Sequence, residues 1–221
     1  MAIEQGPPTI DRIFLVGFMG AGKTTVGKLL AQRLGWSFVD LDDRIRAREG
    51  REIGEIFRES GEGYFRMVEG ACLRELITEG EAKGFRRSAQ DRLSTRANSG
   101  RALGITKTPG PSTRPKGGAS LGKTAEEGVV VALGGGAFVQ AENAATLQRT
   151  GAPVIFLDAT VEELRQRCEG EGAERPLLRD ENQFRQLYEA RRGGYMTADF
   201  RVDTGGKTPE QVVEELLAFS F

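Results

Sequence analysis

The sequence predicts an α/β fold in which helices cover both faces of a five-stranded parallel sheet. Short apolar segments alternate with segments of helical periodicity, which is the pattern of a three-layer α/β sandwich. The apolar segments carry few polar residues, as is typical of central parallel strands. A glycine-rich turn joins the first strand directly to a helix. The expected strands are Arg12–Val16, Trp36–Asp40, Val129–Leu133, Pro153–Leu157 and Phe200–Asp203.

Helices are expected between these strands, where apolar residues recur three and four positions apart. The first expected helix ends before Gly35, a suitable C-terminal cap. Thr160 and Glu163 form a capping box, and Pro209 fits the first turn of the closing helix. The expected helices are Lys23–Leu34, Asp43–Gly50, Arg51–Ser60, Gly61–Glu79, Glu142–Thr150, one beginning near Thr160, Gln183–Arg192 and Thr208–Phe219.

The glycine-rich turn, Gly17–Thr24, matches the phosphate-binding pattern G-x-x-x-x-G-K-[ST]. Its glycines let consecutive backbone N–H groups point into one hollow, and the following helix adds the positive end of its dipole. Lys23 can reach the β- and γ-phosphates, and the Thr24 hydroxyl can ligate Mg²⁺. A chance match is improbable between a strand and a helix, so the turn predicts binding of ATP or GTP with magnesium.

Two carboxylates, Asp40 and Asp42, follow the second strand at its carboxyl end, where open α/β sheets bind ligands. Residues two apart in an extended chain point the same way, so both could face the phosphates. One could hold magnesium through water, and the other could accept a proton from an attacking hydroxyl. The alternatives are that both are solvated turn residues, or that Asp42 caps the next helix.

Composition narrows the class of protein. Hydrophobic residues make up 38% and charged residues 29%, without an apolar run near the roughly 18 residues that span a bilayer. Residues 1–11 form an expected tail and do not resemble a secretory signal. Cys72 and Cys168 are far apart, which favours a reducing cytoplasm over a disulfide framework. Histidine is absent, which excludes Ser-His and Cys-His nucleophiles and the usual zinc sites.

A basic segment interrupts the single domain expected over residues 12–221. Between Ala82 and Thr124 it contains ten Lys or Arg residues and one acid, a charge of +10 − 1 = +9, so the rest of the chain carries −1 − 9 = −10. Its few large apolar residues cannot offset the entropy of ordering, which predicts a disordered insertion over about 82–126. Its charge could attract nucleic acid, but a solvated linker is favoured because Phe85 is its one aromatic residue.

Further candidate residues lie later in the chain. Gly134-Gly135-Gly136 follows the third strand and allows close backbone approach to a ligand, although a flexible turn is the alternative. Arg175 lies in a polar segment that could form a lid over phosphates, or an ordinary connection. Arg66 lies among apolar helical positions, and pattern alone favours an exposed arginine there.

Taken together, these residues resemble the shikimate kinase family from about Arg12 to Phe219, outside the basic insertion. The phosphate loop alone is common to many enzymes, whereas the ordered combination is specific. The resembling stretches are Gly17–Thr25, Asp40-Leu41-Asp42, Ile53-Gly54-Glu55-Ile56-Phe57, Gly61-Glu62, Phe65-Arg66, Glu69, Leu133-Gly134-Gly135-Gly136, Arg175-Pro176-Leu177-Leu178, Arg191 with Tyr195, and Val202-Asp203-Thr204.

The resemblance implies a sheet of strand order 2-3-1-4-5 and ATP-dependent phosphorylation of the 3-hydroxyl group of shikimate, with Mg²⁺, on the route to aromatic amino acids. Asp42 would bind the hydroxyl and act as base, and Arg66 and Arg191 would hold the substrate carboxylate. Gly135 would contact ring hydroxyls, and Asp40 would support magnesium through water. The implied ATP-binding residues are Gly20, Ala21, Gly22, Lys23, Thr24, Thr25 and Arg175.

Three features depart from the family pattern. Gly193 replaces a usual proline, the insertion is unusually long, and Arg192 competes with Arg191 for the carboxylate role. Another small hydroxy acid, such as gluconate, is the alternative substrate. A non-enzymatic nucleotide- or nucleic-acid-binding protein is a further alternative, disfavoured because the expected catalytic residues are present. A cytoplasmic monomer that binds ATP and shikimate is expected, with neither membrane nor nucleic-acid partners.

Overall fold

The structure is a computed structural model that describes residues 10–82, 128–170 and 180–219, with the side chains of 80–82 and 170 left out. Three expectations therefore lie outside the described residues. These are the tail before residue 10, nearly all of the basic insertion, and the lid segment with Arg175.

Five parallel strands form one sheet in the order β2-β3-β1-β4-β5, which confirms the expected order. The strands are β1 (Arg12–Val16), β2 (Ser37–Asp40), β3 (Val129–Ala132), β4 (Val154–Asp158) and β5 (Phe200–Asp203). Every residue of β1, β3 and β4 is buried, as their apolar sequences require. Strand β2 begins one residue later than predicted, because the Trp36 N–H donates to the Ala31 carbonyl at 2.8 Å and closes the preceding helix.

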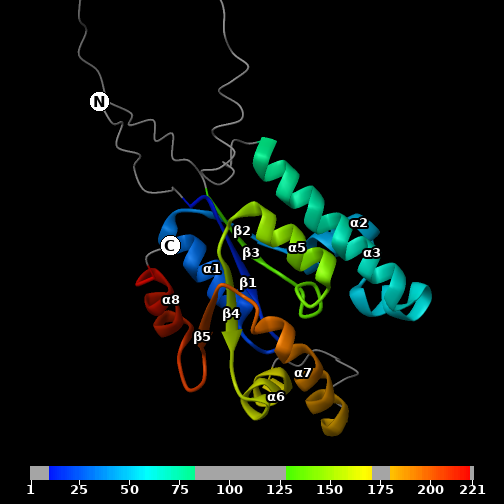
Figure 1. Cartoon of the computed structure of the whole chain (residues 1–221). Coiled ribbons are helices and arrows are strands. Elements are labelled where there is room, and N and C mark those ends of the chain that lie inside the picture. The colour runs from blue at the N-terminus through cyan, green and yellow to red at the C-terminus, as the bar shows by residue number, and fades with distance from the viewer. Residues whose placement is uncertain (1–9, 83–127, 171–179, 220–221) are drawn as a thin grey trace, which may run out of the picture.

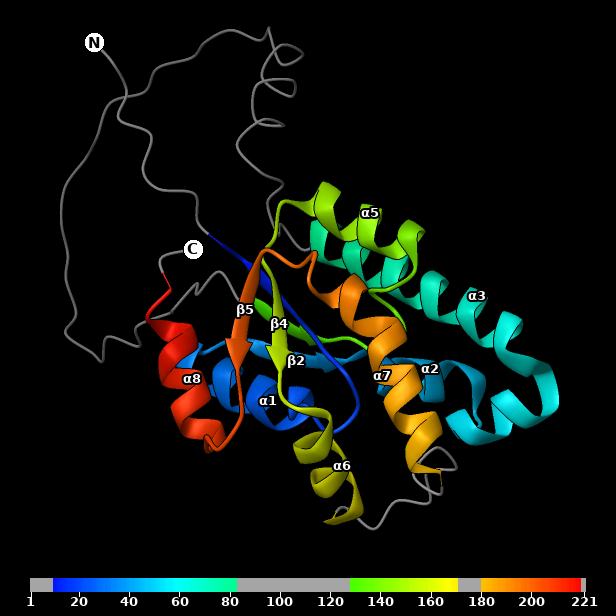
Figure 2. The same cartoon turned by 60° about the horizontal axis from the view of Figure 1, so that its bottom comes forward.

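Helices cover both faces of the sheet and give the expected three layers. Figures 1 and 2 show α1 (Lys23–Leu34) and α8 (Pro209–Leu217) on one face, and α5 (Ala141–Thr150) and α7 (Glu181–Tyr195) on the other. Helix α6 (Val161–Gly170) lies beyond the end of β4. Helix α1 has the predicted bounds, and Thr208 closes the capping box of α8 with Gln211.

Helices α2 (Leu41–Glu49) and α3 (Ile53–Ala82) follow β2 and extend to one side of the sheet (Figure 1). Helix α2 begins two residues earlier than predicted, since the Asp40 side chain accepts a hydrogen bond from the Asp42 N–H. The alternative that Asp42 caps this helix is therefore wrong. Helix α3 breaks at Gly61, whose φ of 79° is left-handed, where two separate helices were predicted to meet.

Helix α7 begins at Glu181, and its Asp180 cap accepts from the N–H groups of Asn182 and Gln183. It continues to Tyr195, three residues beyond the predicted end, through Gly193 and Gly194. Tertiary packing explains the extension, because Tyr195 is fully buried and its ring stacks on Phe156 with centroids 5.2 Å apart. The burial of one large aromatic ring stabilises this turn more than the low helix propensity of two glycines destabilises it.

One hydrophobic core joins the sheet to both helical layers. Within the described residues, none of the helices is long and apolar enough to cross a membrane.

The two glycines in the last turn of α7 are expected to respond oppositely to alanine. A Cβ at Gly193 would meet nothing within 4 Å, whereas one at Gly194 would lie 2.5 Å from Val139 Cγ1. We expect Gly193→Ala to stabilise the protein by about 0.5–1 kcal/mol, because alanine favours helix. Gly194→Ala should destabilise it by about 1–3 kcal/mol through overpacking. Urea unfolding of both variants measures the difference, and equal shifts would contradict this packing.

Candidate functional site

The phosphate-binding pattern forms a loop between β1 and α1. Gly20 and Gly22 have φ values of 78° and 82°, the left-handed region that side chains disfavour. A Cβ at Gly20 would also lie 2.5 Å from the Leu164 carbonyl oxygen. No side chain caps the start of α1, so its first N–H groups are available to an anion. The loop therefore has the backbone that a phosphate site needs.

Polar side chains connect this loop to the end of β2. Lys23 Nζ donates to the carbonyl oxygens of Gly17 and Phe18, each at 2.9 Å. The Thr24 hydroxyl donates to Asp40 Oδ2 at 2.8 Å, and Asp40 Oδ1 accepts from the Asp42 N–H at 3.0 Å. Asp40 therefore both caps α2 and fixes the Thr24 hydroxyl.

These oxygens fit magnesium, which prefers hard oxygen ligands and usually keeps several waters and phosphate oxygens in its shell. Thr24 would supply a hydroxyl ligand, and Asp40 would act through water. Among the described residues, no group of three or more Asp, Glu or Cys side chains is placed to hold a metal ion by itself. The ion would therefore need water and phosphate oxygens as further ligands. When bound with the nucleotide, Mg²⁺ would neutralise charge on its phosphates.

A second group of charged residues surrounds Gly134-Gly135-Gly136, which follows β3. A Cβ at Gly134 would lie 2.7 Å from Asp42 Oδ1 and 3.0 Å from Glu69 Oε1. One at Gly136 would lie 2.3 Å from Arg66 Nη1. The glycines therefore permit close approach by charged side chains, and this packing argues against a merely flexible turn. The predicted approach of this backbone to a ligand stays a prediction.

Arg66 lies on α3 and points into this group. Its side chain is only 20% exposed, so the expectation of an exposed surface arginine is wrong. It donates to Glu62 Oε1 at 3.0 Å and to Glu69 Oε2 at 2.9 Å. Sequence pattern could not show that this side chain points inward, because that depends on its tertiary contact with the Gly136 backbone.

The two adjacent arginines of α7 point in different directions. Arg191 lies over the Phe18 ring of the phosphate loop, 6.0 Å from its centroid, and its Nη1 would lie 3.6 Å from a Cβ at Gly135. Arg192 instead donates to Asp158 Oδ2 at 3.1 Å, on β4. Arg191 is therefore the arginine that joins the glycine segment, whereas its choice over Arg192 for the substrate carboxylate stays a prediction.

Two residues of this group had no role assigned from the sequence. Glu69 is fully buried, and its Oε2 also accepts from Gln140 Nε2 at 2.6 Å. Its Oε1 has no hydrogen-bond partner among the described residues, and burial raises the pKa of its carboxyl group. The spacing of three residues from Arg66 on one helix was the available signal for this pair.

Tyr195 is the other such residue. Its hydroxyl donates to the Gly135 carbonyl oxygen, and burial raises its pKa to about 12, so it stays a neutral donor. Nothing in the local pattern distinguished this tyrosine from a core residue.

Asp42 faces the glycines from the first turn of α2, although part of the residue reaches solvent. Burial of its carboxyl group, together with repulsion from Asp40 and Glu69, raises its pKa from 3.8 to about 6, whereas Lys23 opposes the rise. Asp42 is thus a carboxylate that ionises close to neutral pH and lies between the phosphate loop and the arginines. That position suits a group that accepts a hydrogen bond, or a proton, from a substrate hydroxyl.

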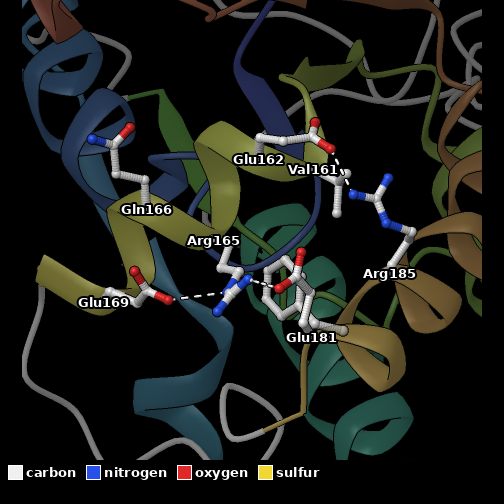
Figure 3. A pocket seen from close by; sticks show the side chains of 8 residues that line it. Val161, Glu162, Arg165, Gln166, Glu169, Glu181 and Arg185 are labelled. Atoms are coloured by element: carbon white, nitrogen blue, oxygen red, sulfur yellow. Dashed lines mark hydrogen bonds and ion pairs between the residues drawn. The ribbon is translucent and has the colours of Figure 1, made fainter.

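A pocket of about 260 Å³ lies between α6 and α7, away from these groups (Figure 3). Its charged walls are joined to each other, with Arg185 donating to Glu162 at 2.7 Å and Arg165 pairing with Glu169 and Glu181. Its Phe184 ring meets Phe18 of the phosphate loop edge-on at 5.1 Å. The residues with catalytic chemistry instead surround the phosphate loop and the glycine segment after β3.

Comparison with known proteins identifies the family. The family model described as shikimate kinase matches residues 19–83 and 119–220. The chain belongs to the shikimate kinase family. The unmatched residues 84–118 fall within the expected insertion, whose disorder and exact extent remain predictions.

This kinase is similar to family members along nearly its whole length. It is 36% identical over 206 residues to the shikimate kinase of Persephonella marina, covering 93% of this chain and 96% of the relative. It is 37% identical over 210 residues to the shikimate kinase of Geobacter sulfurreducens, covering 94% of this chain and 89% of the relative.

Solved structures agree with the fold. Shikimate kinase from Acinetobacter baumannii in complex with shikimate has a TM-score of 0.68 at 30% identity, covering 95% of this chain and 92% of that one. The Aquifex aeolicus shikimate kinase has a TM-score of 0.62 at 30% identity, with 93% of each chain covered. The expected P-loop kinase fold is confirmed.

The raised pKa of Asp42 makes the stability of this kinase depend on pH. A carboxyl group whose pKa is higher in the folded state favours folding less as pH rises from about 4 to 6. We expect Asp42→Asn to match the wild type below pH 4 and to be more stable by about 2 kcal/mol above pH 7. Urea unfolding across pH measures this difference.

Asp43→Asn is the matched control, since it removes an exposed carboxylate from the same helical turn. A pH-independent effect of Asp42→Asn, or an equal effect of Asp43→Asn, would contradict the buried and repelled carboxylate.

Proposed function

We propose that this kinase transfers the γ-phosphoryl group of ATP to the 3-hydroxyl group of shikimate, in the biosynthesis of chorismate and aromatic amino acids. One observation carries the proposal. Asp42, Arg66 and Arg191 converge on the glycine segment beside the phosphate loop, so acceptor groups and phosphate groups lie together. The family membership and the shikimate-bound relative support it.

The arginines would bind the substrate carboxylate. A guanidinium group can bind a carboxylate through two parallel hydrogen bonds, which gives both strength and orientation. The Glu62 side chain is 66% exposed, so its pair with Arg66 is weak and can exchange for the substrate. Glu69 would keep Arg66 in place, because it is buried and also held by Gln140. The Gly135 backbone would contact ring hydroxyl groups.

Asp42 would bind the attacking hydroxyl group and receive its proton. In a loose transition state the bond between the attacking hydroxyl oxygen and phosphorus is weak, so little positive charge develops on that oxygen and its proton need leave only late. Positioning of the hydroxyl group therefore matters more than strong basicity. With a pKa of about 6, Asp42 is mostly ionised at neutral pH, and can accept a hydrogen bond from the hydroxyl. The hydroxyl proton can then move to Asp42 as the new O–P bond forms.

The phosphate loop would hold ATP. Backbone N–H groups of the loop from Gly20 to Thr25 would surround the phosphates, and Lys23 would leave its carbonyl partners to neutralise the β- and γ-phosphates. Thr24 and Asp40 would support Mg²⁺. We include Arg175, outside the described residues, as a further phosphate contact.

Both cysteines are buried and free of disulfide bonds, which fits the cytoplasmic location that we propose. We propose that the kinase acts as a monomer, without nucleic-acid partners.

The direct experiment measures ADP release by the purified chain with ATP and Mg²⁺, supplying shikimate or gluconate as acceptor. We expect turnover with shikimate, phosphorylated at the 3-hydroxyl group, and none with gluconate. Turnover with gluconate but not with shikimate would show that gluconate is the substrate. Turnover with neither acceptor would reject the proposal.

Asp42→Asn is expected to lower kcat on shikimate by about 10²–10⁴-fold, because asparagine cannot accept the proton. The affinity for ATP should stay within a factor of two to three, which calorimetric titration measures. Asp43→Asn is the control and should retain wild-type turnover. An Asp42→Asn variant with wild-type kcat would remove Asp42 from the mechanism.

Arg66→Ala and Arg191→Ala are each expected to raise KM for shikimate about 10–100-fold, since each removes charge-assisted hydrogen bonds worth about 1.5–3 kcal/mol. Replacing shikimate by its methyl ester should raise the KM of the wild type by a similar factor. The same replacement should raise the KM of either variant only a little further. Arg185→Ala, which changes an exposed arginine of α7, is the control. If the effects of the ester and of the substitution on KM were fully additive, these arginines would not bind the carboxylate.

A further inference from the structure

Four side chains form a polar cluster between α7 and the sheet, here called the Asp158 cluster: Asp158 of β4, Tyr188 and Arg192 of α7, and Arg201 of β5. Asp158 Oδ2 accepts a hydrogen bond from Arg192 Nη2 at 3.1 Å and forms an ion pair with Arg201 Nη2 at 2.9 Å. Arg192 Nε donates to the Tyr188 hydroxyl at 3.1 Å, and that hydroxyl donates to the Ala159 carbonyl oxygen at 3.1 Å. The cluster therefore joins the end of α7 to the carboxyl end of β4.

The centre of this cluster is fixed. The Asp158 side chain is only 5% exposed, and it lies on the last residue of a strand that is buried throughout. The two arginines are partly exposed, at 35% and 51%. Because two arginines share one buried carboxylate, loss of either leaves Asp158 paired and the fold intact.

The neighbouring arginine, Arg191, needs such an anchor. It is followed in α7 by Gly193 and Gly194, and glycine is the least favoured helix residue apart from proline. A Cβ at Gly193 would meet nothing within 4 Å, so no contact requires glycine there, and the residue only loosens the turn. Helix propensity alone therefore does not set the direction of Arg191.

Two contacts of residues that follow Arg191 in α7 replace that missing rigidity. Arg192 holds the helix to β4, and the Tyr195 hydroxyl holds it to the Gly135 carbonyl oxygen. Arg191, which directly precedes Arg192, extends over the Phe18 ring toward the glycine segment. Figure 1 shows one end of α7 next to β4, where Arg192 contacts Asp158, and the rest of the helix extending away from the sheet.

We propose that Arg192 is a positioning residue, which through Asp158 orients Arg191 toward the substrate carboxylate. The inference rests on the proposed function for its kinetic consequence, whereas the orientation of Arg191 can be tested without any substrate. Arg192 itself does not touch the reacting groups.

Arg192→Ala and Arg201→Ala form a matched pair, since each removes one arginine from Asp158 but only Arg192 belongs to α7. For Arg192→Ala we expect KM for shikimate to rise about 5–10-fold, with kcat within twofold and KM for ATP unchanged. For Arg201→Ala we expect all three to stay near wild type. Thermal unfolding of both variants verifies that they are folded.

A second change tests the physical reason. Adding Gly193→Ala to Arg192→Ala stiffens the last turn without a new contact, and should recover at least half of the lost KM. If Arg192→Ala only damaged the fold, Gly193→Ala would not restore KM while leaving kcat constant.

Crystal structures of wild type and Arg192→Ala separate this inference from the proposed function. We expect the guanidinium group of Arg191 to leave the Phe18 ring in the variant. An unchanged Arg191, equal KM changes in the matched pair, or a joint fall in kcat and both affinities would each overturn the positioning role. A wild-type chain without shikimate turnover would reject the proposed function, and the two crystal structures would still decide the orientation of Arg191.

Discussion

Close approach to the backbone at the end of β3 is the constraint on which the site depends. Asp42, Glu69 and Arg66 come from two helices outside the sheet, and each lies where a side chain on Gly134 or Gly136 would stand. Three consecutive glycines after a fully buried strand therefore create the space in which charges of both signs can meet. A single Cβ there would displace a carboxylate or a guanidinium group.

The two carboxyl groups in this space differ in how fully neighbouring groups pair with them. Glu69 is fully buried and held by Arg66 and Gln140, so it acts as a fixed partner. Burial of the Asp42 carboxyl group raises its pKa to about 6, with the negative charges of Asp40 and Glu69 adding to the rise and Lys23 opposing it. The same repulsion that weakens the folded state at neutral pH leaves a carboxylate ready to accept a hydrogen bond. Such a local cost in stability is common at functional sites.

Rigid contacts surround the site and arrange its mobile side chains. The phosphate loop packs through Phe18 against Phe184 and Tyr188 of α7, with ring centroids 5.1 and 5.6 Å apart. Arg191 lies over that same Phe18 ring. The nucleotide side and the acceptor side of the site therefore share one aromatic contact, and α7 belongs to both.

Much of the fold and part of the site could be predicted from the sequence alone. The alternation of apolar and amphipathic segments determined five strands, their parallel arrangement and the phosphate loop, because these depend on local periodicity and on glycine-rich turns. The strand order came from the resemblance of several motifs taken together. Tertiary structure alone decided that the Arg66 side chain points inward, that α7 continues to Tyr195, and that Arg191 faces the glycines while Arg192 faces Asp158. These outcomes depend on distant partners, from Asp158, 34 residues from Arg192, to Phe18, 191 − 18 = 173 residues from Arg191. No local pattern records which distant side chain will satisfy a charge or cover a ring.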